Sequence, residues 1–264
     1  VKDLKVVYFA GEWIDNRVIP KLEEWVKAGG VLYCCAGCGH KNQYDEPEPA
    51  MLKLLGLKDV KTTKNAYHMR TLLELPLAEP IDTFTSIKDP KEKTAAVAMK
   101  QQLVPDQAKA WDKWSDGSNA VTRHELGKGH VFAVGTVSST SYYKTGLKAI
   151  PWARGGKHMV YNPTAFTKDY LAGPTAWANV LPTVDCSQNL VESIVLDHKD
   201  GSLVTLVNWT NAPVKNLEVQ VRMPYAPKSV RTVSGQRNLD FTAKDGIVTF
   251  RLDVAEADYV LLLK

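Results

Sequence analysis

The chain has 264 residues, enough for two ordinary domains or one large one. Hydrophobic residues make up 44% and charged residues 23%, as in globular proteins, and no apolar run approaches the ~20 residues that span a bilayer. The net charge is +4, but Lys and Arg are spread along the chain instead of forming a patch. We therefore expect neither nucleic acid nor membrane as a partner.

The first third of the chain alternates between strand-like and helical patterns. Two short apolar runs, residues 6–10 and 31–37, are typical of strands buried on both faces. A helix between two such strands makes a β-α-β unit with parallel strands. A second helix is predicted over 48–55, ending at Gly56. The hydrophobic residues at helical spacing between the two strands are Val18, Leu22, Trp25 and Val26.

The middle of the chain has a weaker pattern. Short strands are predicted at 67–75, 95–99 and 102–104, as an extension of the α/β core. Residues 120–125 and 130–135 flank the turn Gly127-Lys128-Gly129 and predict a hairpin that closes the sheet. The Gly- and Pro-containing stretch that follows predicts a connector with a short helix near 175–180.

From Val191 onward the hydrophobic pattern has a period of two residues. Turn-forming residues, such as Asp200-Gly201 and Asp245-Gly246, separate the apolar runs. Six or seven short strands at regular spacing indicate a small sandwich of immunoglobulin type. The predicted strands are 191–197, 203–209, 217–221, 229–233, 247–252 and 259–263.

Four local patterns occur in a fixed order along about 200 residues. They are the helix and strand over 22–33, Gly37 followed by Tyr44-Asp45-Glu46, the segment 116–131, and the strand 203–210. Together they resemble the region that follows the catalytic barrel in family 42 glycoside hydrolases of the β-galactosidase type. In that family a flavodoxin-like trimerisation domain, related to class I glutamine amidotransferases, precedes a small β-sandwich.

The resemblance implies a fold class and a domain organisation. We expect a flavodoxin-like, mostly parallel sheet with helices on both faces, followed by a small all-β immunoglobulin-like sandwich. The expected α/β domain covers 1–145 and is truncated by one strand–helix unit, in keeping with a fragment that begins at Val1. The expected connector covers 146–188, and the sandwich covers 189–264.

The resemblance also implies a function. The two catalytic carboxylates of the family lie in a barrel of roughly 250 residues, for which this chain has no room. It therefore implies a non-catalytic accessory or oligomerisation region of a carbohydrate-processing protein. Expected partners are a second copy or a catalytic domain of the same parent, with carbohydrate as a further ligand; no cofactor is expected. The compartment stays open between periplasmic or secreted and cytoplasmic.

The sharpest alternative is a cysteine-dependent hydrolase. Class I amidotransferases place a nucleophilic Cys at a tight glycine-flanked turn between strand and helix, and Gly37 and Gly39 flank Cys38 in a similar way, with His40 nearby. However, these glycines are one residue too close, a loop follows instead of a helix, and a downstream His-x-Glu pair is lacking. The simpler interpretation is a glycine turn after a buried strand.

The cysteines raise a second alternative, a zinc site. Cys35 and Cys38 have the spacing of one ligand pair, but the second pair is missing unless His40 and Cys186 supply it. Cys34 and Cys35 point to opposite faces of the predicted strand, so both cannot bind one ion. We therefore expect no metal.

Two further groups are candidates for ligand binding. Asp45 and Glu46 follow a predicted parallel strand at its carboxyl end, where open α/β sheets bind ligands; they could hold a cation or a sugar, or be solvated loop charges. Exposed aromatic rings stack on sugars, which would make the chain a carbohydrate-binding module, although tryptophan also packs in cores and interfaces. The aromatic candidates are Trp111, Trp114, Trp152, Tyr142 and Tyr143.

Overall fold

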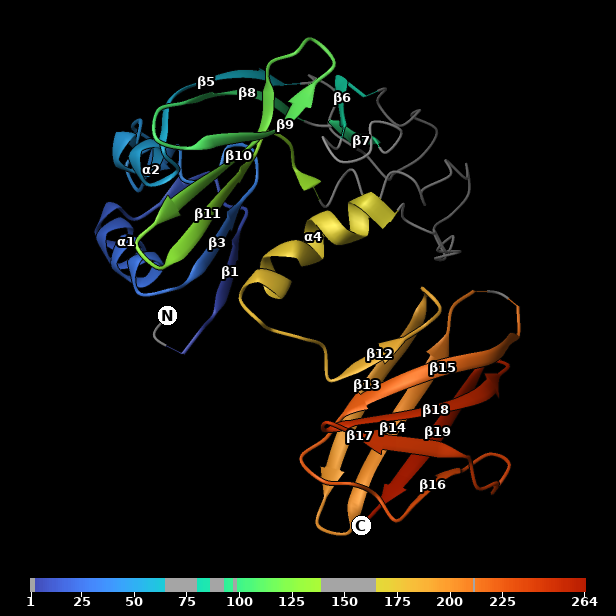
Figure 1. The fold of residues 1–264 in the computed structure, drawn as a ribbon. Helices are drawn as coiled ribbons and strands as arrows, with labels where there is room; N and C mark the ends of the chain where they lie inside the picture. Colours follow the sequence, from blue (N-terminus) through green and yellow to red (C-terminus); the bar gives the residue numbers. More distant parts are fainter. Residues whose placement is uncertain (1–2, 65–79, 86–92, 97–98, 139–164, 211) are drawn as a thin grey trace. The chain divides into compact units, whose positions relative to one another are not determined.

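The computed structural model describes residues 3–64, 80–85, 93–96, 99–138, 165–210 and 212–264. The chain divides into two compact units, Val1–Val180 and Leu181–Lys264, which Figure 1 colours blue to yellow and orange to red. Among the described residues, no helix is both long enough and apolar enough to cross a bilayer.

The first unit is built around one nine-stranded sheet. Its main path is β1-β3-β11-β10-β9-β6-β7, and β8 pairs with both β10 and β5. Strands β2 and β4 form a separate two-stranded sheet. The elements are β1 (Val6–Phe9), β2 (Trp13–Ile14), α1 (Ile19–Lys27), β3 (Val31–Cys34), β4 (Lys41–Asn42), α2 (Pro49–Leu54), β5 (Leu57–Lys64), β6 (Asp82–Thr85), β7 (Lys93–Ala96), β8 (Met99–Pro105), β9 (Lys109–Trp114), β10 (Asn119–Leu126), β11 (Gly129–Val134) and α4 (Ala165–Trp177).

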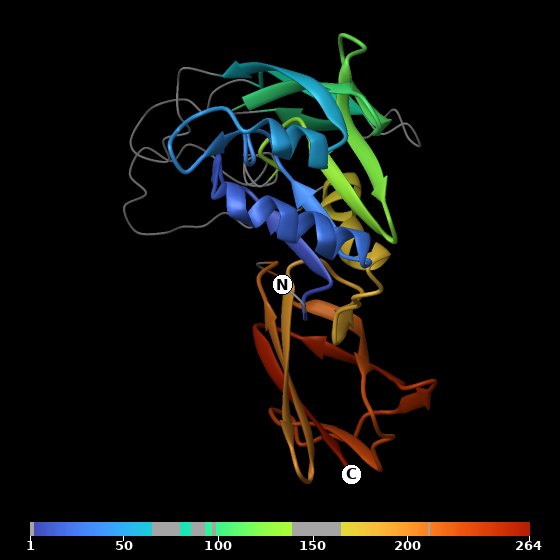
Figure 2. The same ribbon diagram turned by 90° about the vertical axis from the view of Figure 1, so that its left-hand side faces the viewer.

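Strand β3 lies between β1 and β11, and all four of its residues are buried. Leu32 and Cys34 join the hydrophobic cluster that contains α1 and α2, whereas Val31 and Tyr33 join a second cluster that Leu171 of α4 contacts. The alternation arises because successive side chains of a strand point to opposite faces. Figures 1 and 2 show α1 and α4 on opposite sides of these strands.

The predicted flavodoxin-like α/β fold is wrong. Strands make up 53% of the structure and helices 13%, and the sheet is curled and mixed. Within it, only the β1–β3 and β3–β11 pairs among the described strands are parallel. The described residues between 57 and 114 form β5 to β9, which pair antiparallel, and this described part contains no strand–helix unit of the kind that a doubly wound sheet needs. An amidotransferase-like architecture is likewise not supported by this mostly-β unit.

The helix and the two strands predicted in the first third are present, but Val18, predicted on the hydrophobic face of the helix, lies in the preceding 3₁₀ turn and is 40% exposed. Pro20 lies in the first turn of α1, and the Asp15 side chain accepts a hydrogen bond from the Arg17 amide to cap the 3₁₀ turn that leads into the helix. The predicted hairpin is also present, because β10 pairs antiparallel with β11. The predicted strand at 67–75 and the first part of the predicted connector, 146–164, lie outside the described residues. Helix α4 begins earlier than the helix predicted near 175–180.

The second unit consists of two four-stranded antiparallel sheets. Their orders are β12-β15-β18-β17 and β13-β14-β19-β16, and their facing side chains form one hydrophobic core that includes Leu206, Val219 and Phe250. The elements are β12 (Val184–Cys186), β13 (Val191–His198), β14 (Gly201–Asn208), β15 (Val214–Arg222), β16 (Ser229–Thr232), β17 (Phe241–Lys244), β18 (Ile247–Val254) and β19 (Ala257–Leu263).

Candidate functional site

The loops that follow β1 and β3 lie against each other at the carboxyl ends of these strands. The Gly39 amide donates to the Gly11 carbonyl at 2.8 Å, and the Lys41 amide donates to the Glu12 carbonyl at 3.1 Å. The short parallel pair of β2 and β4 continues this contact. The backbone thus brings the sequence candidates Cys38, His40, Asp45 and Glu46 to one end of the sheet.

Cys38 lies at the last position of a tight turn that begins at Cys35. The Cys38 amide donates to the Cys35 carbonyl at 3.1 Å. Gly37 has φ +84°, whereas Ala36 has a negative φ, which is the pattern of a type II turn with glycine at its third position. The Gly37 amide donates to the Gln101 side-chain oxygen at 3.0 Å, which fixes the turn to β8.

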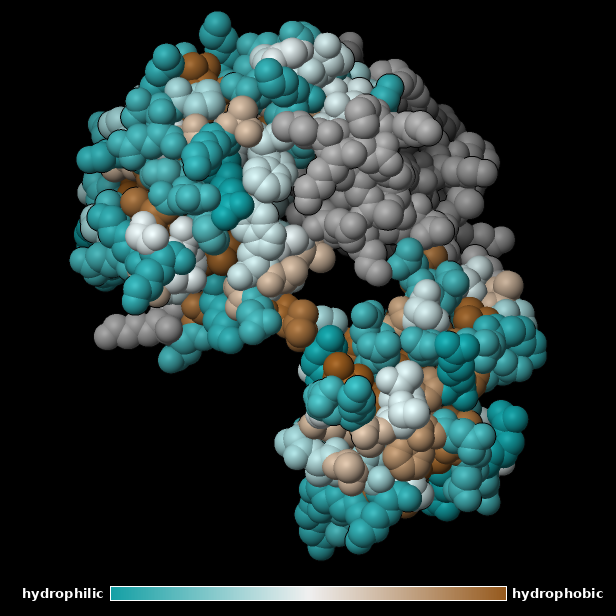
Figure 3. All heavy atoms as spheres, in the orientation of Figure 1, coloured by the Kyte–Doolittle hydropathy of each residue, from teal (hydrophilic) through white to brown (hydrophobic). Residues whose placement is uncertain are grey.

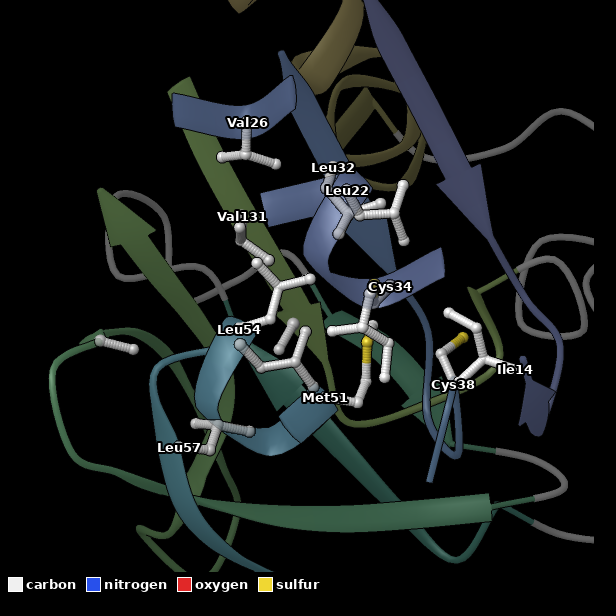
Figure 4. Close-up of a cluster of buried hydrophobic side chains, with 14 of the residues drawn as sticks. Ile14, Leu22, Val26, Leu32, Cys34, Cys38, Met51, Leu54, Leu57 and Val131 are labelled. Atoms are coloured by element: carbon white, nitrogen blue, oxygen red, sulfur yellow. The ribbon is translucent and has the colours of Figure 1, made fainter. Parts of the chain in front are cut away.

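The Cys38 side chain is only 1% exposed and packs in the hydrophobic cluster of the first unit, as Figure 4 shows. Its described polar neighbours are the Phe9 carbonyl and the adjacent cysteines. The hydrogen bond with Cys35, followed by burial, raises the pKa of Cys38, so this thiol is protonated at neutral pH. A buried, protonated thiol does not favour the hydrolase alternative.

His40 and the other cysteines do not complete a reaction centre in the described part of the chain. Burial lowers the pKa of His40, whose charged neighbours are Glu12 and Lys64. Cys186 belongs to the second unit, and all four cysteines are free thiols. Among the described residues, His, Cys, Asp and Glu side chains nowhere gather in groups of three that could hold a metal ion.

Asp45 and Glu46 have hydrogen-bonding partners on the short strands β4 and β2. Asp45 accepts from Lys41 Nζ and from the Trp13 indole, each at 2.7 Å, and these two bonds lower the pKa of Asp45. Glu46 accepts from the Asn42 side chain at 3.0 Å. Both residues are exposed, so the pair belongs to a solvated loop whose charges are bonded to neighbouring residues. The exposed aromatic side chains beside it are Trp13 and Tyr44, at 56% and 73% exposure.

The structure places Trp111 and Trp114 on β9, in packed positions. Trp114 is 2% exposed, contacts Phe84 edge to face, and donates its indole N–H to the Gln101 carbonyl at 2.8 Å. Trp111 is half-buried beside Trp177 of α4. The other aromatic candidates, Tyr142, Tyr143 and Trp152, lie outside the described residues.

Trp177 attaches the end of α4 to the sheet. The Arg123 guanidinium lies 3.9 Å from the centre of the Trp177 ring, and Phe132 contacts the same ring at 4.3 Å between centroids. Arg123 also lies over Trp111 at 5.6 Å, so one cation contacts both indole rings.

Replacing Trp177 by Ala is expected to lower the free energy of unfolding of the first unit by about 2 kcal/mol. A buried Trp→Ala change costs roughly 3–5 kcal/mol, and Trp177 retains 38% exposure. Urea unfolding measures the change. Trp13→Ala is the matched control and should cost less than about 1 kcal/mol, because that ring lies largely in solvent. Equal losses of unfolding free energy in both variants would contradict the role of Trp177 in attaching α4 to the sheet.

The sequence analysis missed an apolar surface on the second unit. Outward-pointing side chains of the β13-β14-β19-β16 sheet align in rows, such as Leu196 beside Leu203 and Leu203 beside Leu261. Ile194, Leu196 and Tyr259 are 53%, 54% and 50% exposed. Figure 3 shows hydrophobic atoms among polar ones on the visible side of this unit. We call the following set the apolar sheet face: Ile194, Leu196, Leu203, Val207, Tyr259 and Leu261.

The opposite sheet has the polar outer surface that a free sandwich is expected to have. Its outward residues include Glu218, Gln220, Thr249 and Arg251, and Arg251 forms an ion pair with Glu218. One sheet therefore alternates apolar and polar residues, whereas the outer side of the other is mostly apolar, with Thr205 among the apolar residues and Glu192 and Arg231 on its edge strands. In the sequence, the run 191–197 carries this signal, because Ile194 and Leu196 alternate with Val195 and leave neither face polar.

Comparisons with known proteins identify relatives at the level of the fold. No protein-family model and no curated protein matches the sequence. A catalytic mutant of Gan42B, a GH42 β-galactosidase from G. stearothermophilus, matches 100% of this chain at 13% identity and a TM-score of 0.65. The β-galactosidase from Bacillus circulans sp. alkalophilus matches 98% at 14% identity and 0.59, and α-L-fucosidase isoenzyme 2 from Paenibacillus thiaminolyticus matches 98% at 12% and 0.61.

The likeness covers only part of these proteins. The chain corresponds to 32% and 33% of the two β-galactosidases and to 41% of the fucosidase. At such low identities the comparison establishes a shared fold. The expected resemblance to a region of GH42 β-galactosidases therefore holds for the backbone of this segment.

Proposed function

We propose that this chain is a non-catalytic accessory region of a glycoside hydrolase-related protein, and that it associates with a second copy of itself through the apolar sheet face. The apolar sheet face is the observation that carries the proposal. A sheet whose outer side is aliphatic across several strands is stabilised by covering that side, because apolar area gains about 25 cal/mol per Å² when it is removed from water.

The chemistry of this face favours protein over carbohydrate as the occupant. Sugars are held by aromatic platforms combined with directed polar groups, whereas five of the six residues of the apolar sheet face are aliphatic. Trp209 lies beyond the end of β14, and its indole N–H already donates to Glu192 at 3.0 Å. A flat aliphatic surface fits another flat aliphatic surface.

The charges at the edges favour a second copy. Glu192 lies on the edge strand β13, and Arg231 lies on the opposite edge strand β16. A two-fold related copy that places β16 over β13 brings acidic and basic edges together, so the surface is self-complementary in charge as well as in hydrophobicity.

The size of the face sets the expected strength of association. Strands spaced about 4.8 Å apart with about 3.3 Å per residue give the whole four-stranded sheet, whose β13, β14 and β19 carry the apolar sheet face, an outer area of roughly 400 Å². Two copies would then bury about 800 Å², below the roughly 1,000 Å² that a stable interface usually needs. We therefore expect a weak, concentration-dependent dimer with a dissociation constant in the micromolar range or above.

The described residues also support a role without catalysis. Cys38 is buried and protonated, and Asp45 is bonded to Lys41 and Trp13 instead of facing an open pocket. The proteins with the same fold that are named as β-galactosidases are about three times as long as this chain.

Sedimentation equilibrium from low micromolar to submillimolar concentration tests the proposal. The expected result is an average mass that rises from the monomer toward twice the monomer, together with no hydrolysis of nitrophenyl galactosides by the chain. A mass that stays at the monomer over the whole range would contradict self-association. Turnover by the purified chain, lost in a variant of one of its own residues, would contradict the non-catalytic role.

A further inference from the structure

Cys35 and Cys38 lie at the two ends of one turn, which brings their side chains together. The ends of a hydrogen-bonded β-turn have Cα atoms less than about 7 Å apart, and disulfides need about 4.4–6.8 Å. The two thiols affect each other's pKa. Both sulfur atoms also lie near the Phe9 carbonyl oxygen, Cys35 at 3.7 Å and Cys38 at 2.6 Å. The turn therefore holds the pair in a geometry that one sulfur–sulfur bond can close.

The two thiols differ in access. Cys35 is half-buried, whereas Cys38 is 1% exposed, so an external reagent reaches Cys35 first. The other two cysteines lack this arrangement. Cys34 is 1% exposed on the adjacent strand position, and Cys186 lies on β12 of the second unit without a neighbouring cysteine.

We propose that Cys35 and Cys38 form a dithiol–disulfide couple that exchanges with small-molecule disulfides. The Cys35 thiolate attacks one sulfur of the reagent R–S–S–R, the reagent's sulfur–sulfur bond breaks, and one R–S⁻ leaves and takes a proton from water. Cys38 then loses its proton to water, and its sulfur attacks the Cys35 sulfur of the mixed disulfide, expelling the second R–S⁻, which is also protonated. Two protein thiols are oxidised to one disulfide, and the reagent is reduced to two thiols.

The electrostatics of the pair agree with this division of roles. The hydrogen bond with Cys38 lowers the pKa of Cys35, against the opposing effect of burial. The same interaction, with burial, raises the pKa of Cys38. The difference in access assigns the roles: the half-buried Cys35 thiol is the attacking group, and the shielded Cys38 thiol reacts after the mixed disulfide has formed.

The couple goes beyond the proposed accessory role, because it lies in the first unit and the apolar sheet face lies in the second. Closing the turn links only four residues, so the change in chain entropy is small. The Gly39–Gly11 backbone bond lies next to the turn, so the oxidation state acts on the contact between the loops after β1 and β3.

Intact mass spectrometry after alkylation tests the couple on the native chain. The protein is incubated with excess oxidised glutathione, then quenched with N-ethylmaleimide. The expected product contains one disulfide, with the loss of two hydrogens, and carries no glutathione. When it is alkylated after unfolding, it has two fewer alkylated cysteines than the untreated chain. Peptide mapping should locate the bond between Cys35 and Cys38.

Single variants separate the two roles. Cys38→Ser should stop at a glutathione adduct on Cys35, and Cys35→Ser should leave Cys38 unmodified while the chain is folded. Cys186→Ser is the control and should form the internal disulfide as the unmodified chain does. A bond mapped to another pair, or no mixed disulfide in the Cys38→Ser variant, would overturn the proposal. The mapping on the unmodified chain decides the question even if a variant fails to fold.

Discussion

Lysine at both Ile194 and Leu196 is expected to abolish self-association while leaving the fold of the second unit intact. Both side chains are more than half exposed in a single copy, so the lysines remain solvated there. In a face-to-face dimer each replaced side chain removes about 1.5 kcal/mol or more of apolar burial, and 1.4 kcal/mol corresponds to a factor of ten. The dimer constant should therefore weaken by roughly a hundredfold or more.

The opposite sheet offers a matched control. Thr242 and Thr249 are paired residues on β17 and β18, and both point outward from the polar side of the sandwich. Thr242→Lys with Thr249→Lys adds the same two charges and should leave the sedimentation profile unchanged. If both double variants weaken association equally, the effect comes from total charge, and the apolar sheet face is not the interface.

Replacing Lys100 by Met is expected to cost the first unit about 3–5 kcal/mol of unfolding free energy. Lys100 is 9% exposed, and its Nζ donates to Asp82 at 2.6 Å and to Asp116 at 2.8 Å. Removing one partner of a buried ion pair leaves the other charge without compensation, which costs about 3–5 kcal/mol. The penalty falls mainly on the Asp82 carboxylate, because its side chain is nearly buried and would lose the Lys100 ammonium.

The same network predicts a dependence on pH. Burial opposes ionisation of Asp82, but the hydrogen bonds from Lys100 and Ser115 outweigh it and lower the pKa of Asp82. The hydrogen bonds from Lys100 and Ser118 lower the pKa of Asp116. Groups with a depressed pKa stabilise the folded state fully above the unfolded value of about 3.9, and this contribution is lost as pH falls below it.

Urea unfolding at neutral pH, repeated at decreasing pH, measures both effects. Lys215→Met breaks an exposed pair with Asp253 and should cost less than about 1 kcal/mol. Adding Asp82→Asn to Lys100→Met should recover part of the loss, because both charges are then gone. A Lys100→Met loss no larger than that of Lys215→Met would contradict a role for the buried network.

The first third of the fold could be predicted because local signals there agree with one another. The helical spacing of Leu22, Trp25 and Val26 matches their burial in α1, and Pro20 marks its first turn. Uninterrupted apolar runs then indicated the central strands, and β3 is indeed buried at every residue.

The fold class was wrong because residues 57–114 give no clear period. In β5, Leu57 is buried, Val60 is half-buried, and the other six residues are exposed. Such a strand lies at the edge of the sheet and pairs with β8 alone. Its Lys and Thr residues resemble a loop in the sequence, so the antiparallel extension was not visible, and a familiar parallel architecture was assumed in its place.

The sequence predicted the local turn at Cys38 correctly, but it did not predict which candidate side chains would be buried. The turn at Cys38 was expected as a glycine turn after a buried strand, and the structure has that turn with Gly37 at positive φ. Trp114 was a ligand candidate but lies in the core, because sequence alone does not indicate which tryptophan a hairpin will bury. The apolar sheet face was missed for a related reason. A strand that is apolar on both sides is buried on both in most folds, and only coordinates reveal which side remains uncovered.

Hydroxyl-radical footprinting at low and high protein concentration tests the central claim most directly, because it reports side-chain access residue by residue. The account predicts that oxidation of Leu196 and Tyr259 falls as the concentration rises through the dimerisation range, whereas oxidation of Phe241 and Tyr44 stays constant. Oxidation of Leu196 and Tyr259 that remains constant while the chain dimerises would contradict the apolar sheet face as the contact between copies.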